Sequence, residues 1–156
     1  MRIETNRVNY ESVTDNLAIR CQNLWKIFGA RAQEALVAAK AGEVDKDEAF
    51  KRFGCVIGVA DARFSVKTGE IFCIMGLSGS GKSTVIRHVN RLMEPTEGKI
   101  YVEGKDVMGL NDKDLRDMRA RKIGMVFQHM ALWPHKTIAE NVAFGLEVQN
   151  TPKDTR

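Results

Sequence analysis

The residues best suited to chemistry form a glycine-rich run, Gly76–Thr84, which reads Gly-Leu-Ser-Gly-Ser-Gly-Lys-Ser-Thr. The run matches the phosphate-binding pattern GxxxxGK[ST] at every constrained position. Glycines let backbone N–H groups converge on an anion, because they reach positive φ and carry no Cβ. Lys82 would neutralise terminal phosphates, and the Ser83 hydroxyl is a hard oxygen ligand suited to Mg²⁺. The predicted nucleotide-binding residues are Gly76, Leu77, Ser78, Gly79, Ser80, Gly81, Lys82, Ser83 and Thr84.

The elements on either side of this run should position it. Ile71–Met75 is a continuous apolar stretch and predicts a strand buried on both faces. An amphipathic pattern from Lys82 to about Met93 predicts a helix, whose first turn would aim unpaired N–H groups at an anion. This order of strand, loop and helix is the setting that the phosphate-binding pattern requires.

Two further positions could complete a nucleotide site. Phe28 ends the aromatic segment Trp25–Phe28 and could stack on adenine, although such aromatics also occur as ordinary core residues. Gln128 follows Ile123–Phe127, which predicts another buried strand, and could contact Mg²⁺ or orient a water. From the residues alone, Gln128 could equally be an ordinary residue at the end of a strand.

The rest of the chain alternates between strand and helix patterns, which indicates an α/β fold. Residues 1–16 are polar and aperiodic and predict a loose tail before one partial domain at 17–156. The other predicted elements are a half-buried strand at 17–22, two short helices within about 30–53 with a capping box of Asp45 and Glu48, strands at 56–66 and 100–102, a charged helix from Asn111 or Asp112 to about Arg121, and a helix opened by a capping box of Thr137 and Glu140.

Composition narrows the class of protein. The 156 residues are 44% hydrophobic and 28% charged, which excludes a disordered chain. The net charge of +4 comes from interleaved acids and bases, so no nucleic-acid partner is expected. The three cysteines, Cys21, Cys55 and Cys73, lack metal-ligand spacing and predict buried, reduced thiols in a cytosolic chain. The sequence holds no apolar run of about 18 residues and no signal peptide.

Several segments together resemble the N-terminal half of the ATP-binding subunit of an ABC transporter, over about residues 17–149. The resemblance implies a P-loop NTPase of the ABC ATPase type, here a partial core with N-terminal antiparallel strands and a helical insertion at about 30–53. It is closest to the branch that imports glycine betaine and proline betaine, which are quaternary amines. The segments that carry it are Leu24–Gly29, Ile74–Thr84, Asn90–Gly98, Ile123–Gln128 and Ala131–Thr137.

The resemblance implies a role for each candidate residue. Phe28 would stack on adenine, and residues 76–84 would be the Walker A motif. Gln128 would be the glutamine of the Q-loop at 126–135, which contacts Mg²⁺ and water, so Ser83 and Gln128 would hold the metal. Lys82 would stabilise phosphate charge during hydrolysis. The implied cofactors are ATP and Mg²⁺.

The resemblance also implies partners. Two copies would form a homodimer and dock, through roughly 129–142, on a transmembrane permease, while an external substrate-binding protein delivers the solute. The subunit would be peripheral, at the cytoplasmic face of the inner or plasma membrane.

One departure from the family pattern limits these expectations. The signature motif, Walker B, the catalytic glutamate and the switch histidine would all follow the Q-loop, and none occurs in this sequence. We therefore expect a truncated chain that is inactive alone and exposes apolar residues at 71–75 and 123–127. The alternatives are the ATPase subunit of another importer, such as one for polar amino acids, a small-molecule kinase, or a non-catalytic ATP-binding module.

Overall fold

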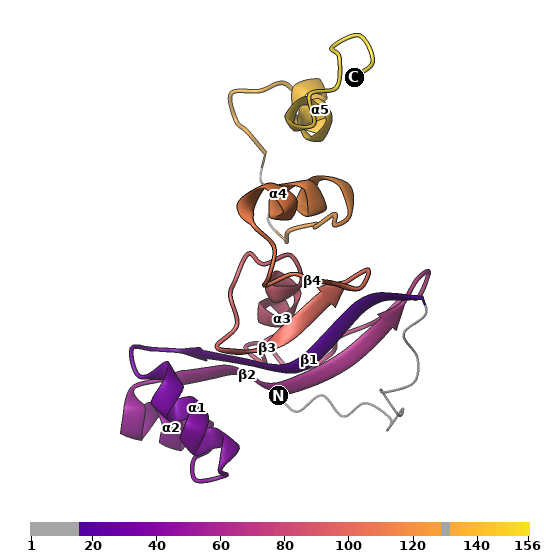
Figure 1. Cartoon of the computed structure of the whole chain (residues 1–156). Helices are drawn as coiled ribbons and strands as arrows, with labels where there is room; N and C mark the ends of the chain where they lie inside the picture. The colour runs from indigo at the N-terminus through magenta and orange to yellow at the C-terminus, as the bar shows by residue number, and fades with distance from the viewer. Residues whose placement is uncertain (1–15, 129–131) are drawn as a thin grey trace. The chain divides into compact units, whose positions relative to one another are not determined.

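The computed structural model describes residues 16–128 and 132–156 and divides the chain into two compact units, the first ending at Leu110 and the second beginning at Asn111. Figure 1 labels the elements along the chain. Each unit is described by itself. The predicted tail at 1–16 lies almost wholly outside the described residues.

The first unit is built on a four-stranded antiparallel sheet in the order β2-β1-β3-β4. β1 and β2 are the two long strands of Figure 1, and their pairing runs from Leu17 opposite Lys67 to Phe28 opposite Val56. The register therefore fixes Phe28 at the end of the ribbon, beside the start of β2. The strands are β1 (Leu17–Phe28), β2 (Val56–Lys67), β3 (Glu97–Val102) and β4 (Lys105–Asp106).

A short helix, α3 (Lys82–Val89), packs on this sheet. Its buried residues are Val85 and His88, and both belong to the set of fully buried side chains that includes Leu24 of β1 and Ile100 of β3. The helix ends at Val89 and not near Met93 as predicted. Because α3 shares this core with the sheet, the residues at its N-terminus have a fixed place relative to β1 and β2.

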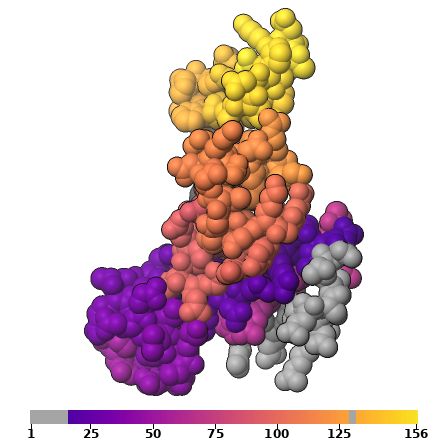
Figure 2. Space-filling model, in the orientation of Figure 1, coloured from indigo at the N-terminus to yellow at the C-terminus, as the bar shows by residue number. Residues whose placement is uncertain are grey.

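The chain between β1 and β2 forms two helices, α1 (Ala32–Lys40) and α2 (Lys46–Phe53), as the pattern predicted. The Asp45 capping box is confirmed: the Glu48 N–H donates to Asp45 Oδ1 at 2.8 Å, and the Asp45 N–H donates to Glu48 Oε2 at 3.1 Å. Figure 2 shows the close-packed surface of this helical pair. Its core includes Trp25, Ile27, Ala35, Leu36, Ala49, Cys55 and Ile57.

The prediction of a buried strand at Ile71–Met75 is wrong. The segment is irregular, and the Ile71 and Met75 side chains are 91% and 82% exposed. A strand buried on both faces needs a partner on each side for its backbone groups, and no strand among the described residues pairs with this segment. Phe72 is anchored, because its ring stacks on Phe64 with centroids 5.2 Å apart.

The prediction of a strand at Ile123–Phe127 is wrong for the same reason. This segment is irregular, with Val126 98% and Phe127 46% exposed. The expectation that both apolar runs are exposed is confirmed, although they form irregular segments and not strand edges.

The second unit contains the two helices α4 (Asp112–Arg121) and α5 (Ile138–Val148). Asn111 caps α4, with its Oδ1 accepting from the N–H groups of Lys113 and Asp114. The predicted capping box of Thr137 and Glu140 is present at the start of α5. The two helices are linked by a hydrogen bond from Gln149 Nε2 to the Ala120 carbonyl, at 2.9 Å.

The cysteines are only partly as predicted. Cys21 and Cys55 are buried free thiols, and burial raises the pKa of Cys21 to about 12. Cys73 is exposed, so the prediction of a buried thiol there is wrong, because it lies in the irregular segment 71–75. Within the described residues, no group of His, Cys, Asp and Glu side chains could hold a metal ion. No helix of that part of the chain is long and apolar enough to cross a bilayer.

Candidate functional site

The glycine-rich run forms a loop that ends at the N-terminus of α3. Gly79 has φ 75° and Gly81, the N-cap of α3, has φ 92°, both in the left-handed region that favours glycine. In the described structure no side chain caps this helix, and its first turn contains no acidic residue. The first N–H groups and the positive end of the helix dipole therefore suit an anionic ligand.

Lys82 lies against the same loop. Its Nζ donates to the carbonyl oxygens of Gly76, at 2.8 Å, and Leu77, at 2.6 Å, with Ser80 Oγ at 3.5 Å. These contacts hold the ammonium group at the loop. They also keep the loop curved around the ammonium group. A positive charge is thus fixed next to the helix N-terminus.

Most of the loop surface is open to solvent. Gly76, Leu77, Ser78 and Gly79 are exposed, and so is Ser83 in the first turn of α3. A Cβ at Gly79 would meet no atom within 4 Å, so its glycine is explained by backbone conformation and not by crowding. The hydroxyl groups of Ser78 and Ser83 are both exposed on this surface.

Two glycines join the loop to Phe28. A Cβ at Gly81 would collide with the carbonyl oxygen of Gly58, in β2. A Cβ at Gly58 would lie 2.7 Å from Cε2 of the Phe28 ring. The ring and the end of the loop thus pack on the same residue of β2. Sequence reasoning missed Gly58, although a glycine inside a strand pattern often marks a close approach.

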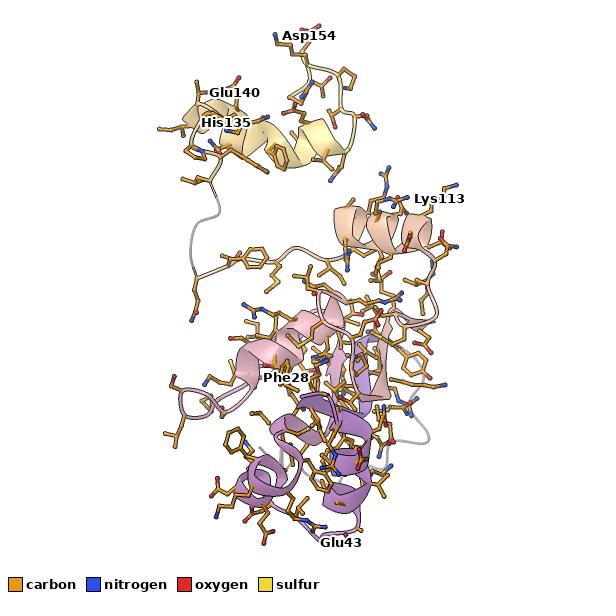
Figure 3. All side chains as sticks on the ribbon, turned by 90° about the vertical axis from the view of Figure 1, so that its left-hand side faces the viewer. Phe28, Glu43, Lys113, His135, Glu140 and Asp154 are labelled. Atoms are coloured by element: carbon orange, nitrogen blue, oxygen red, sulfur yellow. The ribbon has the colours of Figure 1, made fainter. Side chains whose placement is uncertain are left out.

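Phe28 differs from the other apolar residues of its segment. Trp25 and Ile27 are 9% and 2% exposed and belong to the core, whereas Phe28 is 39% exposed at the end of β1. The Lys26 ammonium lies 5.2 Å from the centroid of the ring. Figure 3 shows Phe28 in side-chain view. The exposed aromatic is thus linked through Gly58 to Gly81, at the end of the loop.

His88 was not predicted as a residue of interest. It is fully buried on α3, and its Nδ1 donates to the Thr84 carbonyl at 2.6 Å. Burial lowers the pKa of His88, and the charge of Lys26 lowers it further, while the bond to Thr84 raises it. The neutral imidazole therefore supports the first turn of α3 from inside the core.

Gln128 belongs to the second unit, where it is exposed directly after the irregular segment 123–127. Part of the predicted Q-loop at 126–135, and of the docking segment at 129–142, lies outside the described residues. Beyond residue 131, the centroids of the Trp133 and Phe144 rings lie 5.6 Å apart. The Trp133 backbone N–H donates to Asn141 Oδ1.

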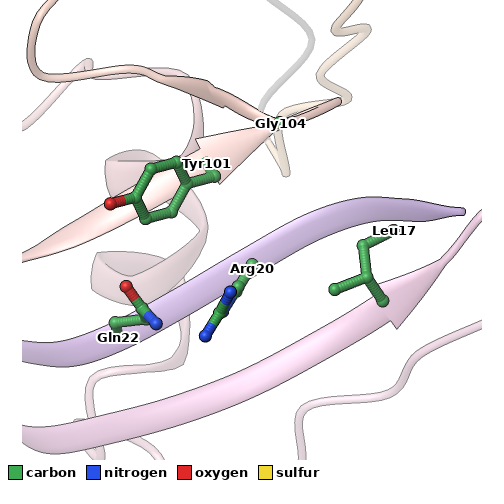
Figure 4. Close-up of a pocket in the computed structure, with 5 residues that line it drawn as sticks. All are labelled: Leu17, Arg20, Gln22, Tyr101 and Gly104. Atoms are coloured by element: carbon green, nitrogen blue, oxygen red, sulfur yellow. The ribbon is translucent and has the colours of Figure 1, made fainter. Parts of the chain in front are cut away.

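A separate hollow of the first unit lies over β1 and β3 (Figure 4). None of its lining residues belongs to the phosphate-binding loop. They are Leu17, Arg20, Gln22, Tyr101 and Gly104.

Known proteins share both the sequence and the fold. The chain is 49% identical, over 84% of its length, to the trimethylamine N-oxide transport system ATP-binding protein TmoW of Pelagibacter ubique. It is 44% identical, over 90% of its length, to the glycine betaine/proline betaine transport system ATP-binding protein ProV of Escherichia coli. The chain spans little more than a third of these two relatives, 38% and 35% respectively.

Among solved structures, the dimeric ATP-binding cassette MJ0796 in a post-hydrolysis state bound to ADP and Pi matches with a TM-score of 0.64 and 28% identity. That match covers 86% of this chain and 48% of the cassette. The fold is thus a partial P-loop NTPase core of the ABC ATPase type. Because the ABC transporter family model matches residues 59–156, well over half of its length, this chain belongs to the ABC transporter family.

Proposed function

We propose that this chain binds ATP and Mg²⁺ as part of the ATPase subunit of an importer for glycine betaine, proline betaine or a similar methylated amine. The observation that carries the proposal is the placement of Lys82 within a glycine loop at the N-terminus of α3, with the exposed Phe28 tied to that loop through Gly58. The relatives named above support the class of solute, and the trimethylamine N-oxide system among them extends it beyond the betaines.

Each residue has a physical role in this proposal. The N–H groups of the loop and of the first turn of α3 bind phosphate oxygens, and Lys82 neutralises charge on the terminal phosphates. Phe28 stacks on adenine through its exposed ring. Ser83 would offer Mg²⁺ a hydroxyl oxygen, and the family resemblance suggests that Gln128 would contact the metal and orient water. When bound, Mg²⁺ supplies the charge that stabilises phosphate oxygens during transfer.

We further propose that the whole subunit works as a homodimer on a transmembrane permease, at the cytoplasmic face of the membrane, with an external substrate-binding protein. An apolar row on α5 supports a protein partner for the second unit. Ile138, Val142 and Leu146 follow one another at a spacing of four residues and are 85%, 79% and 41% exposed. Exposed apolar patches of this kind mark interaction surfaces.

Replacement of Lys82 tests the site. Lys82→Ala removes the charge-assisted bonds to phosphate, which are worth about 1.5–3 kcal/mol, so we expect ATP to bind about 10- to 100-fold more weakly. Isothermal titration of the 156-residue chain with Mg-ATP measures the change. Lys113→Ala, at an exposed position of α4, is the matched control and should leave affinity unchanged. Equal ATP affinity of the Lys82 variant and the unaltered chain would refute the proposal.

A further inference from the structure

The segment Glu94–Thr96, which follows α3, is bound to β1 immediately before Phe28. The Thr96 hydroxyl accepts from the Ile27 N–H at 2.9 Å and donates to the Ile27 carbonyl at 3.3 Å. The Thr96 N–H donates to the Trp25 carbonyl at 2.8 Å. Three hydrogen bonds with one threonine therefore hold the backbone of Trp25 and Ile27, just before Phe28.

Lys26 connects the same segment to the aromatic ring. Its Nζ donates to the Glu94 carbonyl at 2.8 Å, and the same atom lies 5.2 Å from the centroid of the Phe28 ring. A cation at this distance over a ring face is attracted by the negative face of the π system. Because the ammonium is itself held by the Glu94 carbonyl, the attraction restrains the ring as well as the lysine.

A third restraint comes from β2, where Gly58 has no side chain and the Cε2 side of the ring packs against it. The ring is thus restrained by a cation on one face and by a backbone at one side, and it remains 39% exposed. A ring restrained in advance loses little freedom when a flat ligand stacks on it.

We propose that Lys26 and Thr96, with the Glu94 carbonyl, form a clamp that holds Phe28 as a platform for the nucleotide base. Both are positioning residues that act through Phe28, and they set the contribution of the base to affinity separately from that of the phosphates. The clamp rests on the proposed function, because it assumes that the ligand is a nucleotide held by residues 76–84.

The clamp makes a prediction that a merely structural role does not. Loss of the clamp should weaken the binding of a ligand that has a base and leave the affinity for a ligand without a base unchanged. The two probes are Mg-ATP and Mg-tripolyphosphate, and the readout is the ratio of their Kd values in the 156-residue chain. Lys26→Met keeps the aliphatic stem without the charge, and Thr96→Val keeps the shape without the hydroxyl.

We expect each variant to bind ATP about 3- to 10-fold more weakly, with the Kd for tripolyphosphate changed less than about 2-fold. Lys26→Arg, which keeps the cation, should restore most of the ATP affinity. In a Phe28→Ala background, Lys26→Met should have no further effect on ATP, because its target ring is gone. Lys99→Met, at an exposed position of β3, is the matched control.

The outcomes separate the clamp from the proposed function. If the unaltered chain binds both probes and the two variants weaken both equally, or neither, the clamp is wrong and the nucleotide site stands. If Lys26→Met still weakens ATP in the Phe28→Ala background, the lysine acts on the ligand directly and the clamp is again wrong. If the unaltered chain binds neither probe, the proposed function and the clamp fail together.

Discussion

At the scale of single residues, the site depends on two side chains and on one position that has none. Lys82 contributes charge, Phe28 contributes an exposed ring, and Gly58 lets the ring and the loop approach the same point of β2. The first two belong to recognisable patterns. Gly58 acts by having no side chain, so any side chain at this position should disturb the packing of the ring.

Gly58→Ala should displace the Phe28 ring, because the new Cβ would lie 2.7 Å from its Cε2 atom. We expect a loss of about 0.5–1.5 kcal/mol in the free energy of unfolding, the cost of forcing a side chain off its rotamer, and a larger loss of affinity for ATP than for tripolyphosphate. Denaturant unfolding and titration measure the two effects.

The matched control for Gly58→Ala is Gly145→Ala. Gly145 lies within α5 at negative φ, and a Cβ there would meet nothing within 4 Å. It should leave ATP binding unchanged and stabilise the helix slightly. If Gly58→Ala were as harmless as this control, the close approach of ring and strand would be wrong.

At the scale of elements, the helical pair α1–α2 connects the end of β1 to the start of β2. Gly29 follows Phe28 directly, and a Cβ there would lie 2.6 Å from the Cys55 sulfur, just before β2 begins. The pair shares a core with the ends of these two strands, which includes Trp25, Ile27 and Ile57, and Lys40 of α1 also pairs with Glu97 of β3.

Asp45→Ala tests how far the helical pair is independent of the site. Loss of the capping box should lower the free energy of unfolding by about 0.5–2 kcal/mol, measured in urea, with ATP affinity unchanged. Asp45→Asn should recover most of the loss, since asparagine caps equally well. An equal loss in both variants would show that the carboxylate charge matters and not the hydrogen bond.

At the scale of the whole molecule, the stability of the first unit should depend on pH through His88. Burial holds the pKa of His88 below its ordinary value of 6.5, with the Lys26 charge adding to the effect. The unfolded chain then binds more protons than the folded chain at acidic pH, so stability is fully present above about pH 6.5 and falls as the pH is lowered through that value.

Urea unfolding followed between pH 5 and 8 measures this dependence. His88→Leu should remove the part of the pH dependence of the free energy of unfolding, below about pH 6.5, that comes from His88, since a leucine side chain cannot bind a proton. An unaltered slope in the His88 variant would show that another group is responsible.

Most helices and the antiparallel strands could be predicted, because local rules govern them. The capping boxes at Asp45 and Thr137 and the alternation in β1 act between residues a few positions apart. The strand predictions for Ile71–Met75 and Ile123–Phe127 failed because an apolar run becomes a buried strand only beside partners. No strand among the described residues pairs with either one.

By itself, the sequence determined the spacing of glycines, a lysine and a serine in one loop, and this spacing predicts a phosphate-binding site. Only the tertiary structure decided which distant residues lie beside that loop. The antiparallel register of β1 and β2 sets Phe28 beside Gly58, and the packing of α3 on the sheet presses Gly81 onto the same glycine. Contacts between residues so far apart depend on strand register and on the shared core, and a local pattern contains neither.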